Sequence, residues 1–229
     1  MYASGPHLSK TRLVSAAQAA AAAAFVLAAP AHAVVTTYTH PTAWAAALSQ
    51  APTLIDFDGL ADNTPLAAQY SGVNFDAFNG GSPLVVNYSF AQTGLNLVAL
   101  STPPLTGGGG GVAMDFAASL AGVGFWYLDS EFAGNGVTVR AAGNALLTSY
   151  EMVFPAPAAW RFVGFVDSAG GIRRLEVAIG AADMVALDSL MFAAAPVPEP
   201  TRAALALTGA ALLFGLSRGR RAMQARSAP

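Results

Sequence analysis

The stretch Gly122-Val123-Gly124-Phe125-Trp126-Tyr127-Leu128 is apolar at odd and even positions alike. Successive side chains of a β-strand point to opposite faces of the sheet, so a strand of this composition needs cover on both faces. Residues 120–128 are therefore predicted to form a central strand, and their aromatic rings are expected to be packed and not to form an exposed platform.

Similar short apolar or alternating runs lie on both sides of this stretch, separated by clusters of Gly, Pro, Asn and Ser. Regular punctuation of about 8–12 residues predicts an all-β fold, either a sandwich or a barrel. One short helix is expected over Pro41–Ser49, with Pro in its first turn. The predicted strands are Thr53–Phe57, Val73–Phe75, Leu84–Phe90, Leu95–Leu100, Gly111–Phe116, Leu120–Leu128, Gly136–Ala141, Ala145–Val153, Trp160–Val166, Arg174–Ile179 and Met184–Phe192.

The charged residues are sorted along the chain. All 13 acidic residues lie between Asp56 and Glu199, where only Arg140, Arg161, Arg173 and Arg174 are basic, so this stretch carries a net charge of −9. An acidic body disfavours nucleic acid as a partner, because phosphates need a basic face. The remaining basic residues flank apolar runs at both ends, which is typical of membrane topology signals.

The composition excludes several kinds of catalytic site. The chain has no cysteine, and its three histidines are His7, His32 and His40. Disulfides, thiolate metal sites and thiol nucleophiles are therefore excluded. Only His40 lies outside residues 1–33, so a Ser-His-Asp triad has almost no histidine to use and a multi-histidine metal site has too few. No catalytic residue is assigned, no cofactor is required, and the protein is expected not to be an enzyme.

Residues 1–33 have the order of features of a secretory signal peptide. Lys10 and Arg12 precede an apolar run over residues 13–30, and Ala31-His32-Ala33 supplies the small-x-small cleavage pattern at Ala31 and Ala33. Signal peptidase would leave residues 34–195 as the exported domain. A buried alanine-rich helix is the alternative, and the specific order of charge, apolar run and cleavage pattern favours export.

The C-terminal segment, residues 196–229, carries a second apolar run. Residues 203–216 contain no charge, and 14 helical residues span roughly 21 Å, short of a hydrocarbon core of about 30 Å. Arg218, Arg220 and Arg221 follow at once in the tail 217–229, and positive residues stay on the cytoplasmic side. The sequence therefore predicts a transmembrane helix over 203–216 with these arginines as the stop-transfer element.

Immediately before this helix stands Val197-Pro198-Glu199-Pro200, which two prolines hold extended. The order of Pro-Glu-Pro, short apolar helix and arginine cluster over residues 197–221 resembles the PEP-CTERM sorting signal of Gram-negative bacteria. The resemblance implies that Pro198, Glu199 and Pro200 are recognised by an exosortase-type processing enzyme. It also implies export, an intermediate anchored in the inner membrane, and sorting to the cell surface or an exopolysaccharide matrix. The helix is then either a temporary or a permanent anchor.

Two stretches of the middle domain extend this resemblance. Residues 55–60 (IDFDGL) and 185–192 (VALDSLMF) look like the first and last strands of the jelly-roll domains exported with PEP-CTERM signals. The resemblance implies an antiparallel, jelly-roll-like β-sandwich related in shape to carbohydrate-binding modules. Polysaccharide is the ligand class that it implies.

Acidic residues near these two stretches suggest an ion site. Asp56, Asp58 and Asp62 offer the hard oxygen ligands that calcium prefers, and Asp188 joins them if the last strand pairs beside the first. A structural Ca²⁺ is therefore a hypothesis. Asp129 and Glu131 form a second acidic pair, interpreted either as a solvated loop or as the paired carboxylates of a glycosidase.

The turns also hold aromatic residues that could stack on sugar rings. Trp160, Tyr70, Phe78 and Tyr88 lie near turns, and each fits either a binding platform or ordinary packing. Five glycines at Gly107–Gly111 predict a flexible hairpin loop. Together these features predict a non-enzymatic exported protein of the surface or matrix that binds carbohydrate. The alternative is a secreted polysaccharide hydrolase, which would show a cleft lined by convergent acids with raised pKa values.

Overall fold

The computed structural model describes residues 34–100, 110–128, 130, 133–152, 159–180 and 183–196. Over these residues it is an all-β fold in which every strand pair is antiparallel, as the sequence predicted. The elements are β1 (Val35–Tyr38), α2 (Pro41–Ala46), β2 (Thr53–Ile55), β3 (Thr64–Pro65), β4 (Val73–Ala77), β5 (Leu84–Asn87), β6 (Asn96–Ala99), β7 (Gly110–Leu128), β8 (Gly136–Ala141), the 3₁₀ turn η1 (Ala142–Asn144), β9 (Leu146–Glu151), β10 (Arg161–Asp167), β11 (Ile172–Ile179) and β12 (Ala186–Ala194).

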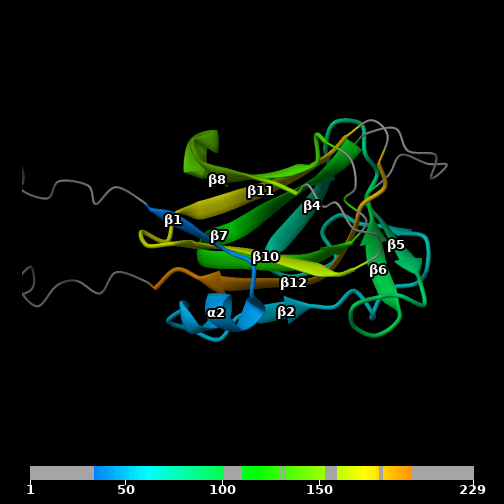
Figure 1. The fold of residues 1–229 in the computed structure, drawn as a ribbon, viewed down its shortest axis with the longest axis horizontal. Coiled ribbons are helices and arrows are strands. Elements are labelled where there is room, and N and C mark those ends of the chain that lie inside the picture. Colours follow the sequence, from blue (N-terminus) through cyan, green and yellow to red (C-terminus); the bar gives the residue numbers. More distant parts are fainter. Residues whose placement is uncertain are drawn as a thin grey trace, which may run out of the picture.

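The long strand β7 joins the two layers of a β-sandwich. Its first half pairs with β4 and β11, and its second half pairs with β10 and β12 (Figure 1). One layer is therefore β4-β7-β11-β8-β9, and the other is β1-β10-β7-β12. Different parts of β12 also pair with β2 and with β6, and β6 continues to β5 and β3.

The core lies between these layers and is built by alternation. Val123, Phe125 and Tyr127 of β7 are buried, and so are Leu175 and Val177 of β11. Their neighbours Glu176 and Arg174 face the outside of the layer, where they form ion pairs. Each large apolar side chain buried in this way contributes about 1.5–3 kcal/mol to folding.

The outer face of the second layer is covered by α2, as the two-sided apolar pattern of β7 predicted. Trp44 is fully buried, and its indole nitrogen donates a hydrogen bond to the backbone oxygen of Phe165 at 3.2 Å. The ring lies on two glycines. A Cβ atom at Gly164 would stand 2.5 Å from Trp44 Cδ1, and one at Gly122 would stand 3.4 Å from the indole nitrogen and 2.6 Å from Leu48. Glycine is required here by close packing.

Several sequence expectations are corrected. The predicted strands Gly111–Phe116 and Leu120–Leu128 are one continuous strand, because its first half pairs with β4 and β11 and its second half with β10 and β12. Gly110 and Gly111 open this strand instead of extending the glycine loop, and they lie against the backbone of Gly81. Two short strands, β1 and β3, were not predicted.

The predicted targeting segments fall outside the described residues. These are the signal peptide 1–33 with Ala31 and Ala33, and the sorting segment from residue 197 onward with Pro198, Glu199, Pro200, Arg218, Arg220 and Arg221. Within the described ranges no helix is long and apolar enough to span a bilayer.

Candidate functional site

The hairpin of β5 and β6 carries the most exposed aromatic residues in its connecting loop, residues 88–95. Tyr88 is 50% exposed and Phe90 is 66% exposed. Their ring centroids lie 5.6 Å apart with the planes tilted by 53°, so the two rings form a contiguous pair. Leu95, at the other end of the loop, is 61% exposed. We call residues 88–95 the aromatic loop.

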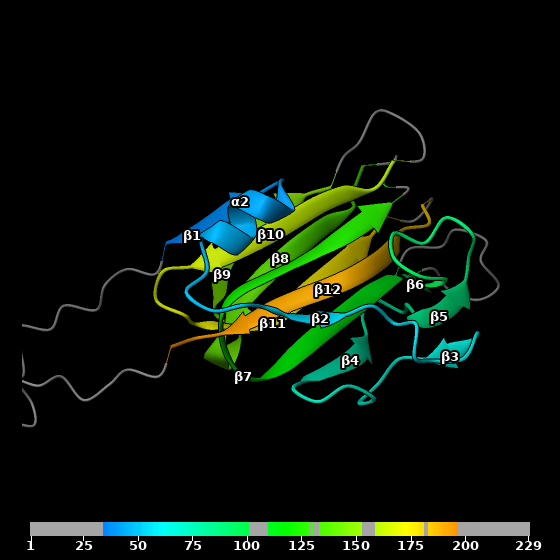
Figure 2. The same cartoon turned by 90° about the horizontal axis from the view of Figure 1, so that it is seen from below.

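The aromatic loop lies at one end of the sandwich. Figure 2 shows β3, β5 and β6 together at this end, and Figures 1 and 2 show the start of β1 and the finish of β12 at the opposite end. The polypeptide therefore enters and leaves the body far from the exposed rings.

Carboxylates hold the backbone of the aromatic loop. Asp58 Oδ1 accepts hydrogen bonds from the amides of Leu95 at 2.8 Å and Asn96 at 3.0 Å. Asp188 Oδ2 accepts from the amides of Gln92 at 2.8 Å and Thr93 at 3.0 Å. The loop is thus fixed from two sides, and the exposed rings need little further ordering on binding.

A third anchor comes from the chain preceding β10. The indole nitrogen of Trp160 donates to the backbone oxygen of Phe90 at 2.7 Å. Across the mouth of the loop, the amide of Tyr88 donates to the oxygen of Leu95 at 2.8 Å. Both residues that carry the exposed rings therefore have fixed backbones.

Asp188 is fully buried and serves this loop from β12. Burial raises its pKa, and the hydrogen bonds that it accepts from Thr93, Ser189 and Gln92 oppose that rise without cancelling it. A register shift in β12 between Asp188 and Met191 places Ser189 at a positive φ of 51°. This irregularity is compatible with the turn of the Asp188 side chain toward the loop.

A hollow of about 530 Å³ lies beside the aromatic loop. It is lined by carboxylate and amide side chains and by apolar ones, among them Asp58, Asp62, Asn87, Asn96, Leu60 and Leu95. Gly94 is confined at its rim, because a Cβ atom there would stand 1.6 Å from Asp58 Oδ2. Such a mixture of hydrogen-bond acceptors, donors and apolar surface suits a polyhydroxylated ligand.

The predicted calcium ligands are only partly brought together. The last strand does pair beside β2, since Leu190 lies opposite Ile55, but Asp188 is then occupied by the aromatic loop. Asp56 accepts from the amide of Asp58, and Asp62 accepts from Asn63 and from the amide of Asn87. Among the described residues no three acidic, histidine or cysteine side chains gather as a metal site. Calcium binding through Asp56, Asp58, Asp62 and Asp188 stays a prediction.

The predicted aromatic residues divide into packed and exposed ones. Tyr88 is exposed, whereas Phe78 and Trp160 are partly buried. Tyr70 packs edge-on against Phe57 and Phe75, and its hydroxyl is buried without a partner in the described residues. Burial raises the pKa of Tyr70, and the charges of Asp56 and Asp58 raise it further. Sequence reasoning missed Phe90, because it was placed inside the predicted strand Leu84–Phe90, which ends at Asn87.

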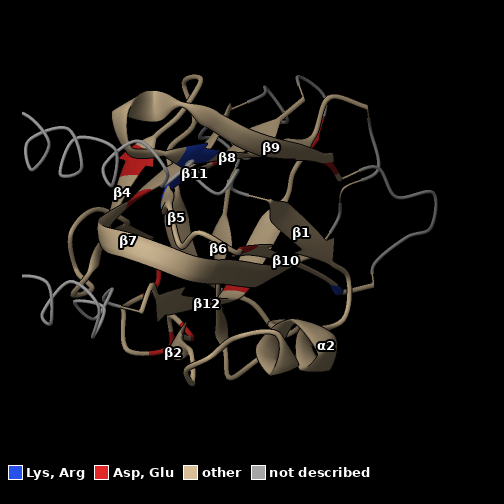
Figure 3. Ribbon diagram, turned by 90° about the vertical axis from the view of Figure 1, so that its left-hand side faces the viewer, with Lys and Arg blue, Asp and Glu red and all other residues tan. Residues whose placement is uncertain are grey.

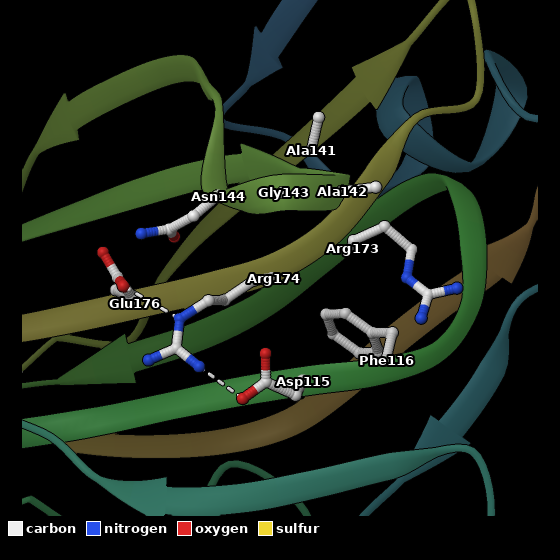
Figure 4. A pocket seen from close by; sticks show the side chains of 9 residues that line it. All are labelled: Asp115, Phe116, Ala141, Ala142, Gly143, Asn144, Arg173, Arg174 and Glu176. Carbon is white, nitrogen blue, oxygen red and sulfur yellow. Dashed lines mark hydrogen bonds and ion pairs between the residues drawn. The ribbon is translucent and has the colours of Figure 1, made fainter.

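A second hollow, of about 480 Å³, lies on the outer face of the first layer, between β7, β11 and the β8–β9 turn (Figure 4). We call it the arginine groove. Glu176 accepts from Arg140 at 2.7 Å and from Arg174 at 2.8 Å, and Arg174 also pairs with Asp115. In Figure 3 most of the ribbon coloured for basic residues lies on β8 and β11, while the stretches coloured for acidic residues are scattered.

Glu176 of the arginine groove does not have the protonation behaviour of a general acid. Burial would raise the pKa of Glu176, but hydrogen bonds and charges from Arg140 and Arg174 outweigh it and lower that pKa. A glycosidase acid needs a raised pKa. The other candidate pair, Asp129 and Glu131, lies outside the described residues.

No protein-family model matches the sequence, and no curated protein matches it. Solved structures show a likeness in fold. A family 11 carbohydrate-binding module of a cellulosomal cellulase from Clostridium thermocellum is 10% identical with a TM-score of 0.39, over 66% of this chain and 100% of that one. The K3 adhesin domain of Lys-gingipain from Porphyromonas gingivalis is 12% identical with a TM-score of 0.43, over 63% and 98%. A family 35 carbohydrate-binding module from Clostridium thermocellum is 17% identical with a TM-score of 0.37, over 59% and 100%.

Proposed function

We propose that this protein is a non-enzymatic, exported polysaccharide-binding protein and that the aromatic loop with its adjoining hollow is the binding site. One observation carries the proposal. Tyr88 and Phe90 are large, exposed and in mutual contact, yet their loop is held by Asp58, Asp188 and Trp160. Exposed aromatic surface on a fixed backbone is typical of a recognition site.

The chemistry of the site fits sugar rings. The C–H faces of a pyranose are apolar and stack on aromatic rings, while its hydroxyls donate to and accept from planar polar groups. Asp62 and Asn87 line the hollow beside the same hairpin. A sugar unit over the rings could therefore place the hydroxyls of its neighbour near carboxylate and amide groups.

A hydrolase is the second candidate function. The lowered pKa of Glu176 argues against this carboxylate as the proton donor of a hydrolase. Glu176 is held ionised by two arginines and accepts from both. Such a carboxylate cannot deliver a proton to a glycosidic oxygen near neutral pH. Glu176 therefore does not supply the proton donor that a glycosidase needs.

The sorting part of the proposal is supported by sequence features. The Pro198-Glu199-Pro200 motif, the apolar residues 203–216 and the three arginines behind them suit processing by an exosortase-type enzyme at the inner membrane. The described chain also leaves the sandwich at the end opposite the aromatic loop (Figure 2). A body anchored there would present the loop outward, toward matrix polysaccharide.

A glycan screen tests the binding proposal. The full chain, purified in a polyoxyethylene detergent that carries no sugar headgroup, is applied to immobilised neutral and acidic bacterial and plant polysaccharides. We expect retention on at least one of them, lost in Phe90→Ala and kept in Leu146→Ala. Leu146 is a suitable control because it is also exposed, at 62%, but lies on β9. Equal retention of both variants, or no retention of the wild type, would refute the site.

A further inference from the structure

We infer that the arginine groove is a subsite for a carboxylate-bearing sugar unit, a uronic acid, so that the polysaccharide bound by this protein is an acidic one. The inference rests on the proposed function. It adds a second site, at a distance from the aromatic loop, and a chemical class of ligand.

The placement of positive charge is the first observation. Arg140, Arg161, Arg173 and Arg174 are the only basic side chains among the described residues other than His40, and three of them surround the arginine groove. Arg173 and Arg174 line it directly, and Arg140 adjoins it through Glu176 and the backbone oxygen of Asn144. On an otherwise acidic body this is the place where an anion is attracted.

The second observation is a bulge that puts both arginines on one side. Neighbouring residues of a strand normally face opposite ways, and Ile172 and Leu175 are both fully buried. Strand β11 has a register shift between Ile172 and Arg174 against both of its partners, β7 and β8, so Arg173 has no opposite residue. The bulge turns Arg173 outward beside Arg174, and bulges of this kind often aim side chains at binding sites.

The third observation concerns the donors that are left over. Arg174 donates from Nε to Glu176 and from Nη1 to Asp115, and Figure 4 shows its remaining terminal nitrogen, Nη2, pointing away from both acids. Arg173 uses Nη1 on the backbone oxygen of Ala117 at 3.1 Å. The remaining guanidinium donors can form the charge-assisted hydrogen bonds that carboxylates accept.

The balance of charge selects the ligand. Three arginines and two acids leave the groove with one net positive charge, which matches one carboxylate. Asp115 and Glu176 offer acceptors for neighbouring hydroxyl groups, which a uronic acid has. A free phosphate or a lipid phosphate lacks those sugar hydroxyls.

The test compares oligogalacturonate with its methyl ester, which keeps the ring but loses the charge. Affinities of the full chain in the same detergent are measured by calorimetry for the wild type, Arg173→Gln and Arg173→Lys. We expect Arg173→Gln to bind the acid at least about tenfold more weakly and the ester unchanged. The affinity of Arg173→Lys for the acid should lie between those of the wild type and Arg173→Gln, because lysine keeps the positive charge but lacks the paired N–H donors of a guanidinium. Arg161→Gln, on β10, is the matched control and should bind both like the wild type.

Other outcomes overturn the inference. Equal affinity of the wild type for acid and ester would do so. An equal loss of affinity for the acid in Arg161→Gln and Arg173→Gln would also do so, because it would indicate a general electrostatic effect. Binding to phosphatidylglycerol vesicles, or to inorganic phosphate, in preference to oligogalacturonate would assign the arginine groove to phosphate. The aromatic-loop proposal is tested separately, by the affinity of Phe90→Ala for the methyl ester. If that affinity equals the wild-type value, the aromatic-loop proposal fails, and this result does not depend on Arg173→Gln.

Discussion

Asp188 Oδ2 lies 2.8 Å from the backbone nitrogen of Gln92, which is 96 positions earlier in the chain. The same carboxylate accepts from the amides of Thr93 and Ser189. A fully buried side chain on β12 therefore shapes a surface loop between β5 and β6. Its shortest hydrogen bonds come from backbone amides, and the hydroxyl of Thr93 adds a longer one at 3.4 Å.

Replacing this anchor should loosen the aromatic loop. In Asp188→Asn, one oxygen becomes an NH₂ donor that faces amide donors, and buried N–H groups lose their acceptor. We expect a loss of about 1–3 kcal/mol in the free energy of unfolding. Hydrogen exchange should accelerate at Gln92 and Thr93. Unchanged exchange at these two amides would show that Asp188 does not hold the loop.

The arginine groove should contribute a specific pH dependence of stability. The folded pKa of Glu176 is lowered from its ordinary value of 4.5, so its stabilising contribution is complete above that pH and is lost as the pH falls through the folded pKa. We expect Glu176→Gln to unfold with about 1–3 kcal/mol less free energy at neutral pH. That difference should shrink as the pH falls from above 4.5 through the lowered folded pKa.

Urea unfolding of both proteins at several pH values measures this difference. Glu151→Gln is the control, since Glu151 is exposed on β9. A difference for Glu176→Gln that stays constant with pH, or that matches the control, would contradict the ion-pair assignment.

The packing of α2 gives a further expectation. A methyl group at Gly164 would stand 2.5 Å from Trp44 Cδ1 and 2.8 Å from Cγ, so Gly164→Ala must displace the indole. We expect a destabilisation of about 1–3 kcal/mol and a red shift of tryptophan fluorescence. Gly59→Ala meets open space and should do neither. A Gly164→Ala protein as stable as Gly59→Ala would refute the close contact.

The sorting proposal predicts a defect in release without a defect in folding. Glu199 stands between Pro198 and Pro200 in the sequence and lies outside the described residues. In the native host, Glu199→Ala should accumulate in the inner-membrane fraction, and the wild type should reach the surface or medium with residues 203–229 removed. Intact mass spectrometry of both fractions measures this. Release of the variant at the wild-type level would refute the recognition role of Glu199.

Elements with clear alternation were predictable from sequence, and irregular ones were not. Strand β8 was predicted with its observed bounds, because Val137 and Val139 alternate with polar residues after a glycine. Strand β1 was missed because Thr36 and Thr37 are both exposed at a sheet edge. The continuity of β7 depends on pairing with four different strands, and no local pattern specifies that.

Of the exposed aromatic pair, only Tyr88 was predictable from the sequence. Tyr88 could be singled out because an aromatic residue near a turn suggests a binding surface. The anchoring roles of Asp58 and Asp188 could not be foreseen, because their partners are backbone amides distant in sequence. The bulge at Arg173 likewise follows from the register of β11 against two neighbours.

The aromatic pair is tested most directly by calorimetry on the neutral glycan that the screen retains. The double variant Tyr88→Ala/Phe90→Ala is compared with Leu146→Ala, after circular dichroism has shown that both are folded. We expect at least about a tenfold loss of affinity in the double variant, because burial of a side chain the size of Phe contributes about 1.5–3 kcal/mol. We expect no loss in Leu146→Ala. Wild-type affinity in the folded double variant would contradict the assignment of the aromatic loop as the carbohydrate site.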